Sequence, residues 1–154
     1  RGLGDVYKRR LFSRAGEMSS QEEAQQFITD NDVTFAVAFG PVMVDNGQLA
    51  EFGSYPIGEN NRTYSRTAIG QRDKLHYILM TINYEDDHSV AATVSEAAEY
   101  IFSKGVVKAY ALDGGQTSTM VMNGHTVNRP DWGNQRTQSD IIYFATALPE
   151  EVNP

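Results

Sequence analysis

Two segments of the chain place their hydrophobic residues at helical spacing, and each begins with the same polar pattern. In the first, Ser20 and Glu23 are three residues apart. This is typical of a capping box, in which the serine caps the helix and the glutamate reaches back to it. Phe27 and Ile28 follow on one helical face. We therefore expect a short helix over residues 20–30.

The second segment has a more regular hydrophobic stripe. Thr93 and Glu96 repeat the spacing of a capping box. The i, i+3, i+4 and i+7 positions behind them are apolar, at Val94, Ala97, Ala98 and Ile101. Lys104 and Gly105 are a cation and a glycine of the kind that end helices. The pattern predicts a helix that ends there and packs its apolar face against a core.

Most of the other hydrophobic residues lie in short runs that are typical of strands. The run Val33–Val44 is rich in valine and phenylalanine and is interrupted at Gly40-Pro41. Further strands are predicted over 67–70, 75–83, 106–112, 117–122, 125–127 and 141–147. With two main helices, the fold class is α+β, with a mixed or antiparallel twisted sheet that forms part of a larger domain.

Turn signals connect these runs. Asn46-Gly47 and Asn123-Gly124 are two-residue sequences that favour tight hairpins. The polar segments 53–62 and 128–138 are expected to be loops. The first 18 residues include a basic, glycine-containing stretch without an apolar period, and we interpret residues 1–18 as an N-terminal arm or a truncated edge.

Composition narrows the classes of function. The chain has 154 residues, a size typical of one domain, and a formal net charge of −7. This charge argues against a nucleic-acid partner, which would need clustered lysine and arginine. There is no cysteine, so zinc–thiolate sites and thiol catalysis are excluded. The three histidines show no mutual ligand spacing, and we expect no metal and no cofactor. No apolar run is long enough to span a membrane, and no signal peptide is visible.

The strongest candidate for a functional site is the segment that follows the predicted strand 106–112. Asp113 follows the strand directly and precedes the pair Gly114–Gly115, and the hydroxyl residues Thr117 and Ser118 lie shortly after. Two glycines let a ligand approach the backbone closely, and successive N–H groups can bind an anion. The alternative interpretation is a tight turn in which the aspartate bonds its own backbone. For Asp-Gly-Gly alone that alternative is favoured, but the full string points to a pocket.

Other charged residues are weaker candidates when taken singly. Arg66 precedes a predicted strand and Arg136 lies in the polar loop before the last one. The guanidinium group matches phosphate geometry, although a surface arginine is the commoner case. Glu96 is a possible second carboxylate beside Asp113, but its capping box already accounts for it.

Taken in order, four motifs resemble those of the phosphodiester glycosidase family. This family contains N-acetylglucosamine-1-phosphodiester alpha-N-acetylglucosaminidase and bacterial members that are often labelled exopolysaccharide-related. The matching motifs are the Arg-Thr-Ala-Ile-Gly string 66–70, the helix 93–100, the Ala-Leu-Asp-Gly-Gly string 111–115 with Ser118, and the string 127–130 followed by Arg136. The resemblance covers roughly residues 33–148.

The resemblance implies an enzyme that hydrolyses a sugar-1-phosphodiester to free sugar and phosphomonoester. On it we assign Asp113, Arg66 and Glu96 as catalytic candidates. The candidates for substrate binding are Gly114, Gly115, Thr117, Ser118, Asn128 and Arg136. The implied partner is a sugar-1-phosphodiester or a phosphate-containing glycan, and the implied location is extracellular or in the cell envelope. Two alternatives stay open: a non-catalytic carbohydrate-binding or cell-envelope module, and a phosphodiesterase that cleaves the P–O bond.

The chain also departs from the family pattern. Gln116 stands where the signature has a third glycine, and Thr117 separates the turn from Ser118. Ala91 or Ala92 stands where a glycine usually precedes the helix. The family's N-terminal half, with an Asn-Gly-Gly-Phe-like motif, has no counterpart here. We therefore expect residues 19–150 to be the C-terminal portion of a family domain, and whether this portion is active alone stays open.

Overall fold

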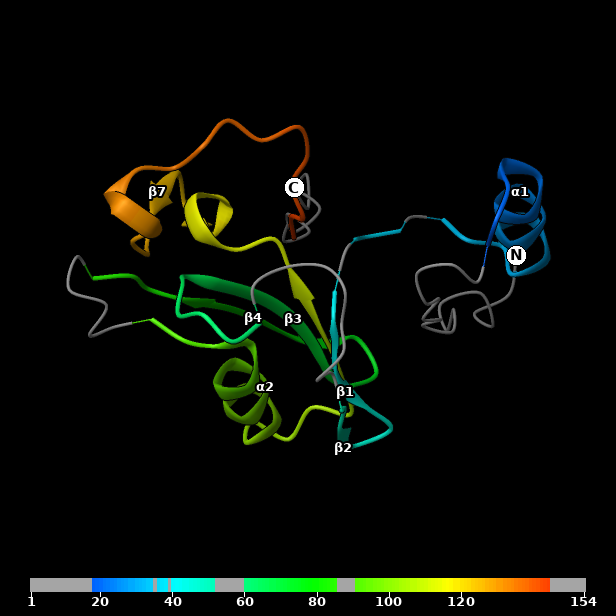
Figure 1. The fold of residues 1–154 in the computed structure, drawn as a ribbon, viewed down its shortest axis with the longest axis horizontal. Helices are drawn as coiled ribbons and strands as arrows, with labels where there is room; N and C mark the ends of the chain where they lie inside the picture. Colours follow the sequence, from blue (N-terminus) through cyan, green and yellow to red (C-terminus); the bar gives the residue numbers. More distant parts are fainter. Residues whose placement is uncertain (1–17, 35, 39, 52–59, 86–90, 145–154) are drawn as a thin grey trace, which may run out of the picture.

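The fold is known from a computed structural model, which describes residues 18–34, 36–38, 40–51, 60–85 and 91–144. The α+β class is confirmed: in these described ranges, two α-helices accompany a five-stranded sheet and a separate two-stranded sheet. Every strand pair in both sheets is antiparallel. Figure 1 shows helix α2 on one side of the large sheet and the small sheet, with its flanking turns, on the other.

The large sheet has the strand order β2-β1-β5-β3-β4. Its strands are β1 (Val42–Asp45), β2 (Gln48–Leu49), β3 (Arg66–Asp73), β4 (His76–Ile82) and β5 (Lys108–Leu112). The predicted hairpin at Asn46-Gly47 is confirmed, because β1 pairs with β2 across it. Both turn residues have positive φ, 49° and 73°, as an Asn-Gly hairpin turn requires.

Helix α2 (Val94–Phe102) provides the other half of the core. Its capping box is complete: the Thr93 hydroxyl accepts the Glu96 N–H, and the Glu96 carboxylate accepts the Thr93 N–H. All four residues of the predicted stripe are buried, at positions 94, 97, 98 and 101. They pack with Met43, Val44, Ala68, Met80, Val106, Ala109 and Ala111. The helix ends at Phe102 with Ser103 as its C-cap, slightly before the predicted end at Lys104 and Gly105. Gly105 still has the positive φ, 76°, that is typical of a glycine after a helix.

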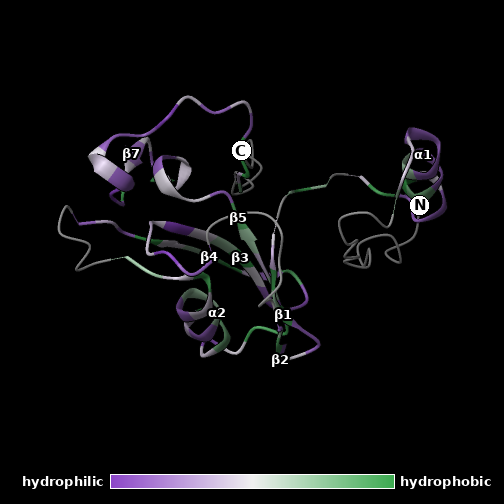
Figure 2. Cartoon of the chain, in the orientation of Figure 1, coloured by the Kyte–Doolittle hydropathy of each residue, from purple (hydrophilic) through white to green (hydrophobic). Residues whose placement is uncertain are grey.

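The chain beyond β5 is irregular and lies on the other side of the sheet. It contains two short 3-10 turns, η2 (Gly115–Thr117) and η3 (Asp131–Gly133). Between them, β6 (Val121–Met122) and β7 (His125–Thr126) confirm the hairpin at Asn123-Gly124. Figure 2 shows that the stretch after η3, residues 134–140, is mainly hydrophilic.

Helix α1 (Gln21–Asp30) confirms the first predicted helix. The Ser20 hydroxyl accepts the Glu23 N–H at 3.1 Å, but the Glu23 carboxylate accepts the N–H of Ser19 instead of Ser20. The predicted capping box is therefore shifted by one residue on its return bond. The helix has no buried residue and stands apart from the sheet in Figure 1.

Three strand predictions are wrong over the described residues. The run 33–44 becomes a strand only at Val42, and its earlier described residues are mostly exposed. Residues 117–120 contain the end of η2 instead of a strand. Residues 141–144 form no strand and are exposed. In 33–38 and 141–144 apolar composition favours a strand, but no strand in the described part of the chain pairs with these residues. In 117–120 the turn η2 extends to Thr117, and the ladder of β6 and β7 is continued only by the Met120 carbonyl, which accepts the Val127 N–H at 2.9 Å. Residues 145–147 and 53–59, parts of a predicted strand and loop, lie outside the described residues.

Candidate functional site

A pocket of about 450 Å³ opens where β5 ends and β3 begins. Its lining comes from both of these strand ends, from the turns η2 and η3, and from the start of α2. The lining residues are Gly40, Met43, Asn60, Tyr64, Arg66, Thr67, Val94, Ala111, Leu112, Asp113, Gly114, Gly115, Gln116, Thr117, Asp131, Trp132 and Arg136. Five of the predicted site residues that line it, Asp113, Gly114, Gly115, Thr117 and Arg136, come from the segment after β5.

Strand register accounts for the meeting of Arg66 and Asp113. In the antiparallel pair β3·β5, Thr67 faces Leu112, so the next positions outward are Arg66 and Asp113. Opposed residues of an antiparallel pair lie on the same face of the sheet. Continued by one residue, this register places two positions that are 47 residues apart in the sequence next to each other at one end of the sheet, and both residues line the pocket.

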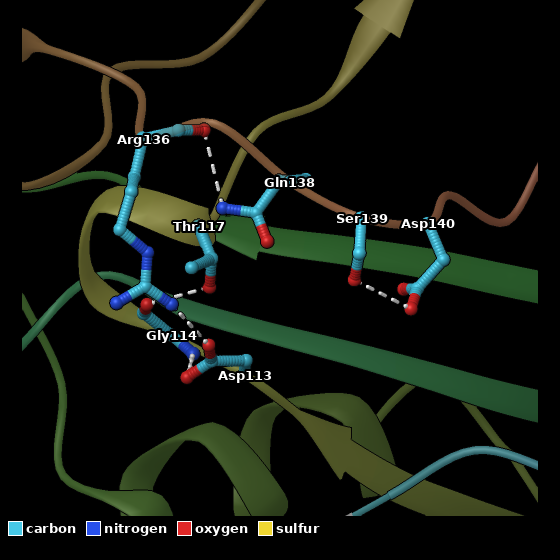
Figure 3. Close-up of polar contacts among 7 residues, drawn as sticks. All are labelled: Asp113, Gly114, Thr117, Arg136, Gln138, Ser139 and Asp140. Carbon is cyan, nitrogen blue, oxygen red and sulfur yellow. Dashed lines mark hydrogen bonds and ion pairs between the residues drawn. The ribbon is translucent and has the colours of Figure 1, made fainter.

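The carboxylate of Asp113 has two donors. Its Oδ1 accepts the Gly114 N–H at 2.9 Å, and its Oδ2 accepts from Nη2 of Arg136 at 3.1 Å. Figure 3 shows the arginine reaching over the Gly114 turn toward this carboxylate. The two side chains are 44% and 61% exposed, so the ion pair is screened by solvent and contributes little to stability. An accessible acid beside a cation is thus available to a ligand.

Arg66 is oriented by backbone carbonyl groups. Its Nε donates to the Ala92 oxygen at 2.9 Å and its Nη2 to the Arg62 oxygen at 2.6 Å. The guanidinium carbon also lies 5.4 Å from the centre of the Tyr64 ring. These contacts hold the guanidinium in the wall of the pocket, and the ion pair with Asp113 comes from Arg136.

The double glycine is packed tightly against the start of β3. A Cβ on Gly114 would lie 2.6 Å from the carbonyl oxygen of Ser65, so no side chain fits. Gly115 has a φ of 64°, and its N–H donates to the same carbonyl at 2.9 Å. The Thr117 hydroxyl donates to the Gly114 carbonyl at 2.7 Å. Asp113 and Gly114 also make the local turn bond of the alternative interpretation, so the turn and the pocket coexist.

Ser118 and Asn128, two predicted substrate-binding residues, are absent from the pocket lining. Ser118 is fully buried, and its hydroxyl accepts from the hydroxyl of Thr67 at 2.8 Å. Asn128 donates to the Ser118 carbonyl at 2.6 Å and accepts the Met120 N–H at 2.7 Å. These contacts stabilise the chain that follows the turn η2. Direct substrate binding by Ser118 and Asn128 stays a prediction.

Glu96 is also outside the lining. Its carboxylate accepts the N–H and the hydroxyl of Thr93, each at 2.8 Å. These two bonds, the backbone one first, hold the pKa of Glu96 below its ordinary value of 4.5. A general acid needs a raised pKa, so this geometry favours the capping role over acid catalysis.

Asp131 and Trp132 are two of the pocket residues that were not among the sequence candidates. Asp131 is fully buried, and its Oδ1 accepts the Ser65 N–H at 2.8 Å. Its Oδ2 has no hydrogen-bond partner among the described residues. Trp132, next to it, is 60% exposed. The only sequence signal is an acid and the single tryptophan of the chain between Pro130 and Gly133, inside a segment predicted to be a polar loop.

Among the described residues, no group of three or more histidine or acidic residues could hold a metal ion. None of their helices has the length and apolar character needed to cross a bilayer.

Comparison with solved structures supports the architecture. A crystal structure described as a hypothetical protein from Synechocystis matches with a TM-score of 0.51 and 24% sequence identity. The match covers 59% of this chain and 17% of that chain, so the chain spans a small part of the length of this relative. At this identity the likeness concerns the fold alone. No curated protein matches at a significant level.

The match to a protein family covers more of the chain than the structural match does. The model of the family described as phosphodiester glycosidase matches residues 6–145, which is most of the chain. The match includes both strand ends, the glycine turn and both arginines of the pocket. The chain belongs to the phosphodiester glycosidase family.

Proposed function

We propose that the protein hydrolyses a sugar-1-phosphodiester at the bond between the anomeric carbon and the phosphodiester oxygen. The observation that carries the proposal is the accessible pair of Asp113 and Arg136 in one pocket. Family membership supports glycosidase chemistry of this kind. The pocket supplies one negative and one positive group, which match the two charges that such a reaction develops.

The negative group suits the sugar half of the reaction. As the C1–O bond lengthens, the anomeric carbon gains oxocarbenium character, which a carboxylate stabilises. Asp113 is fixed by the Gly114 N–H on one oxygen, and its other oxygen meets the arginine. Its carboxylate can therefore face the reacting carbon once the substrate phosphate takes over the arginine.

The positive group suits the phosphate half. The bonding electrons of C1–O stay with the oxygen, and the leaving group departs as a phosphomonoester. This anion needs little help from a general acid, but its added charge needs donors that are already in place. Arg136 can pair with two phosphate oxygens, and Arg66 adds a second guanidinium in the pocket wall. Water supplies the new hydroxyl group at C1 and releases a proton.

The test measures release of free sugar from the methyl phosphodiester of N-acetylglucosamine 1-phosphate. Asp113→Asn keeps an acceptor for the Gly114 N–H but removes the charge, and we expect a fall of kcat/KM of about 10²–10³-fold. Arg136→Ala should cause a fall of roughly 10²-fold, because one charge-stabilising donor is lost. Asp140→Asn is the matched control, since Asp140 is an exposed acid of the same loop that bonds Ser139.

Two outcomes would overturn the proposal. Hydrolysis in ¹⁸O-labelled water should place the label on the sugar, and label on the phosphate would instead indicate a phosphodiesterase that cleaves P–O. Absence of any sugar release that depends on Asp113 would favour a carbohydrate-binding module over an enzyme.

A further inference from the structure

Trp132 is a large, exposed aromatic side chain in the lining of the pocket. It is 60% exposed and lines the same pocket as Asp113 and Arg136. Ligand pockets are commonly walled by aromatic side chains with a few fixed polar groups. Its position gives the pocket an apolar surface beside its charged groups.

The backbone holds this tryptophan in an unfavourable conformation. Its φ of 55° and ψ of 16° fall in the left-handed region, which costs free energy for any residue with a side chain. Strained residues persist only where their surroundings determine the conformation, and they gather at ligand sites. Here the surroundings are Asp131, bonded to the Ser65 N–H, and the Tyr84 ring, whose centre lies 6.1 Å from that of Trp132.

Asp131 adds an independent observation that points to a ligand. Its Oδ2 is buried and lacks a hydrogen-bond donor in the described part of the chain, although Asp131 lines the pocket. A Cβ placed on Gly115 would lie 3.4 Å from this oxygen, so the oxygen faces the glycine turn. A buried acceptor without a donor is unfavourable, and a hydroxyl group entering from the pocket would relieve it.

A sugar ring offers both features that these two residues lack. Its C–H groups form an apolar face, and its hydroxyl groups are hydrogen-bond donors at the ring edge. We propose that Asp131 and Trp132 form the subsite for the sugar ring, with the ring stacked on the indole and one hydroxyl donating to Asp131 Oδ2. The assignment deepens the proposed function, because it rests on the same pocket and leaves the phosphate to Arg136.

The first experiment uses the fact that the chain has a single tryptophan. Its intrinsic fluorescence therefore reports on Trp132 without other contributions of the same kind. Titration with N-acetylglucosamine should give a saturable change in emission, and uridine monophosphate, which lacks that sugar, should give a smaller change. No response to the sugar, or an equal response to the nucleotide, would overturn the subsite.

Variants separate stacking from the hydroxyl contact, with sugar binding measured by calorimetry. Trp132→Phe keeps an aromatic face and should weaken binding only a few-fold, whereas Trp132→Ala should weaken it roughly tenfold. Asp131→Asn can still accept the Ser65 N–H but replaces Oδ2 by a donor, and should weaken binding several-fold. Tyr100→Ala is the matched control, since Tyr100 is an exposed aromatic on α2 outside the pocket lining. Equal affinities in all four variants would overturn the proposal.

The same measurements distinguish this inference from the proposed function. Saturable sugar binding through Trp132 without any hydrolysis would remove the enzyme proposal and support the subsite. Hydrolysis with an unchanged KM in Trp132→Ala and no fluorescence response would do the reverse. Circular dichroism of Trp132→Phe confirms that the fold is retained, which keeps the comparison valid even if Asp131→Asn is unstable.

Discussion

The two faces of the five-stranded sheet are built on different principles. The face toward α2 is apolar and closely packed, with Ala68, Ala109 and Ala111 buried beneath the helix. The opposite face carries Thr67 and Leu112 and is only partly buried. There the irregular segment 113–133 is attached through polar contacts, such as the bond between the Thr67 and Ser118 hydroxyls.

The difference shows how stability and function are divided in this molecule. Burial of apolar side chains secures the α2 face, so removing one of them there costs stability directly. On the opposite face, individual hydrogen bonds position the turns η2 and η3, which complete the lining of the pocket. We therefore expect changes on the first face to alter stability, and changes on the second to alter the site.

The largest expected effect is on the α2 face. Ile101 is fully buried between α2 and the sheet. Ile101→Ala should lower the free energy of unfolding by about 2–5 kcal/mol. Ile69 is only partly buried on the opposite face, and Ile69→Ala should cost about 1–2 kcal/mol. Urea unfolding measures both. Equal losses would show that the two faces do not differ as described.

A smaller loss of stability, with a specific effect on the pocket, is expected at the glycine turn. Gly114→Ala forces a Cβ against the Ser65 carbonyl, so we expect a cost of about 1–3 kcal/mol. Because Ser65 also binds Asp131, the shift should change the Trp132 emission.

Gly124→Ala in the β6–β7 hairpin is the control for that change. A Cβ added at Gly124 would have no neighbouring atom within 4 Å, but the φ of this residue is 78°. It should cost about 1–2 kcal/mol through backbone strain alone. Its Trp132 emission should stay unchanged, and an altered emission would contradict the assignment of the effect to Ser65.

The smallest effect concerns the cap of α2. Thr93→Ala should lower the free energy of unfolding by about 1 kcal/mol, because the Glu96 N–H loses its acceptor.

Because the pKa of Glu96 is lowered in the folded state, the carboxylate stabilises the fold above its ordinary pKa of 4.5. This contribution is lost as the pH falls through the lowered value. The stability difference between wild type and Glu96→Gln, measured by urea unfolding, should therefore be present at pH 7 and vanish in strong acid.

The α2 face could be predicted from the sequence because local periodicity determines it. The stripe from Val94 to Ile101, the capping box at Thr93 and the Asn-Gly hairpins each carry their signal within a few residues. The run 33–44 misled the prediction, because apolar composition does not reveal whether a partner strand exists. The same limit applies to residues 141–144.

The site could be predicted only in part for a related reason. Asp113 and its glycines stand out locally, but the ion pair with Arg136 bridges 23 residues. Asp131 remained hidden because its importance arises from a bond to Ser65, 66 residues away, and nothing near it in the sequence indicates that contact. Glu96 is the reverse case, because its capping box is recognisable locally and is confirmed, while a catalytic role stays a prediction.

Ser65 holds both walls of the pocket with a single residue. Its N–H binds Asp131 beside the tryptophan, and its carbonyl binds the Gly115 N–H of the glycine turn. The wall with Asp131 and the wall with the glycine turn are therefore coupled through Ser65, the residue before β3. A substrate that displaces one wall must move the other, so the sugar end and the phosphate end of the pocket should tighten or loosen in concert.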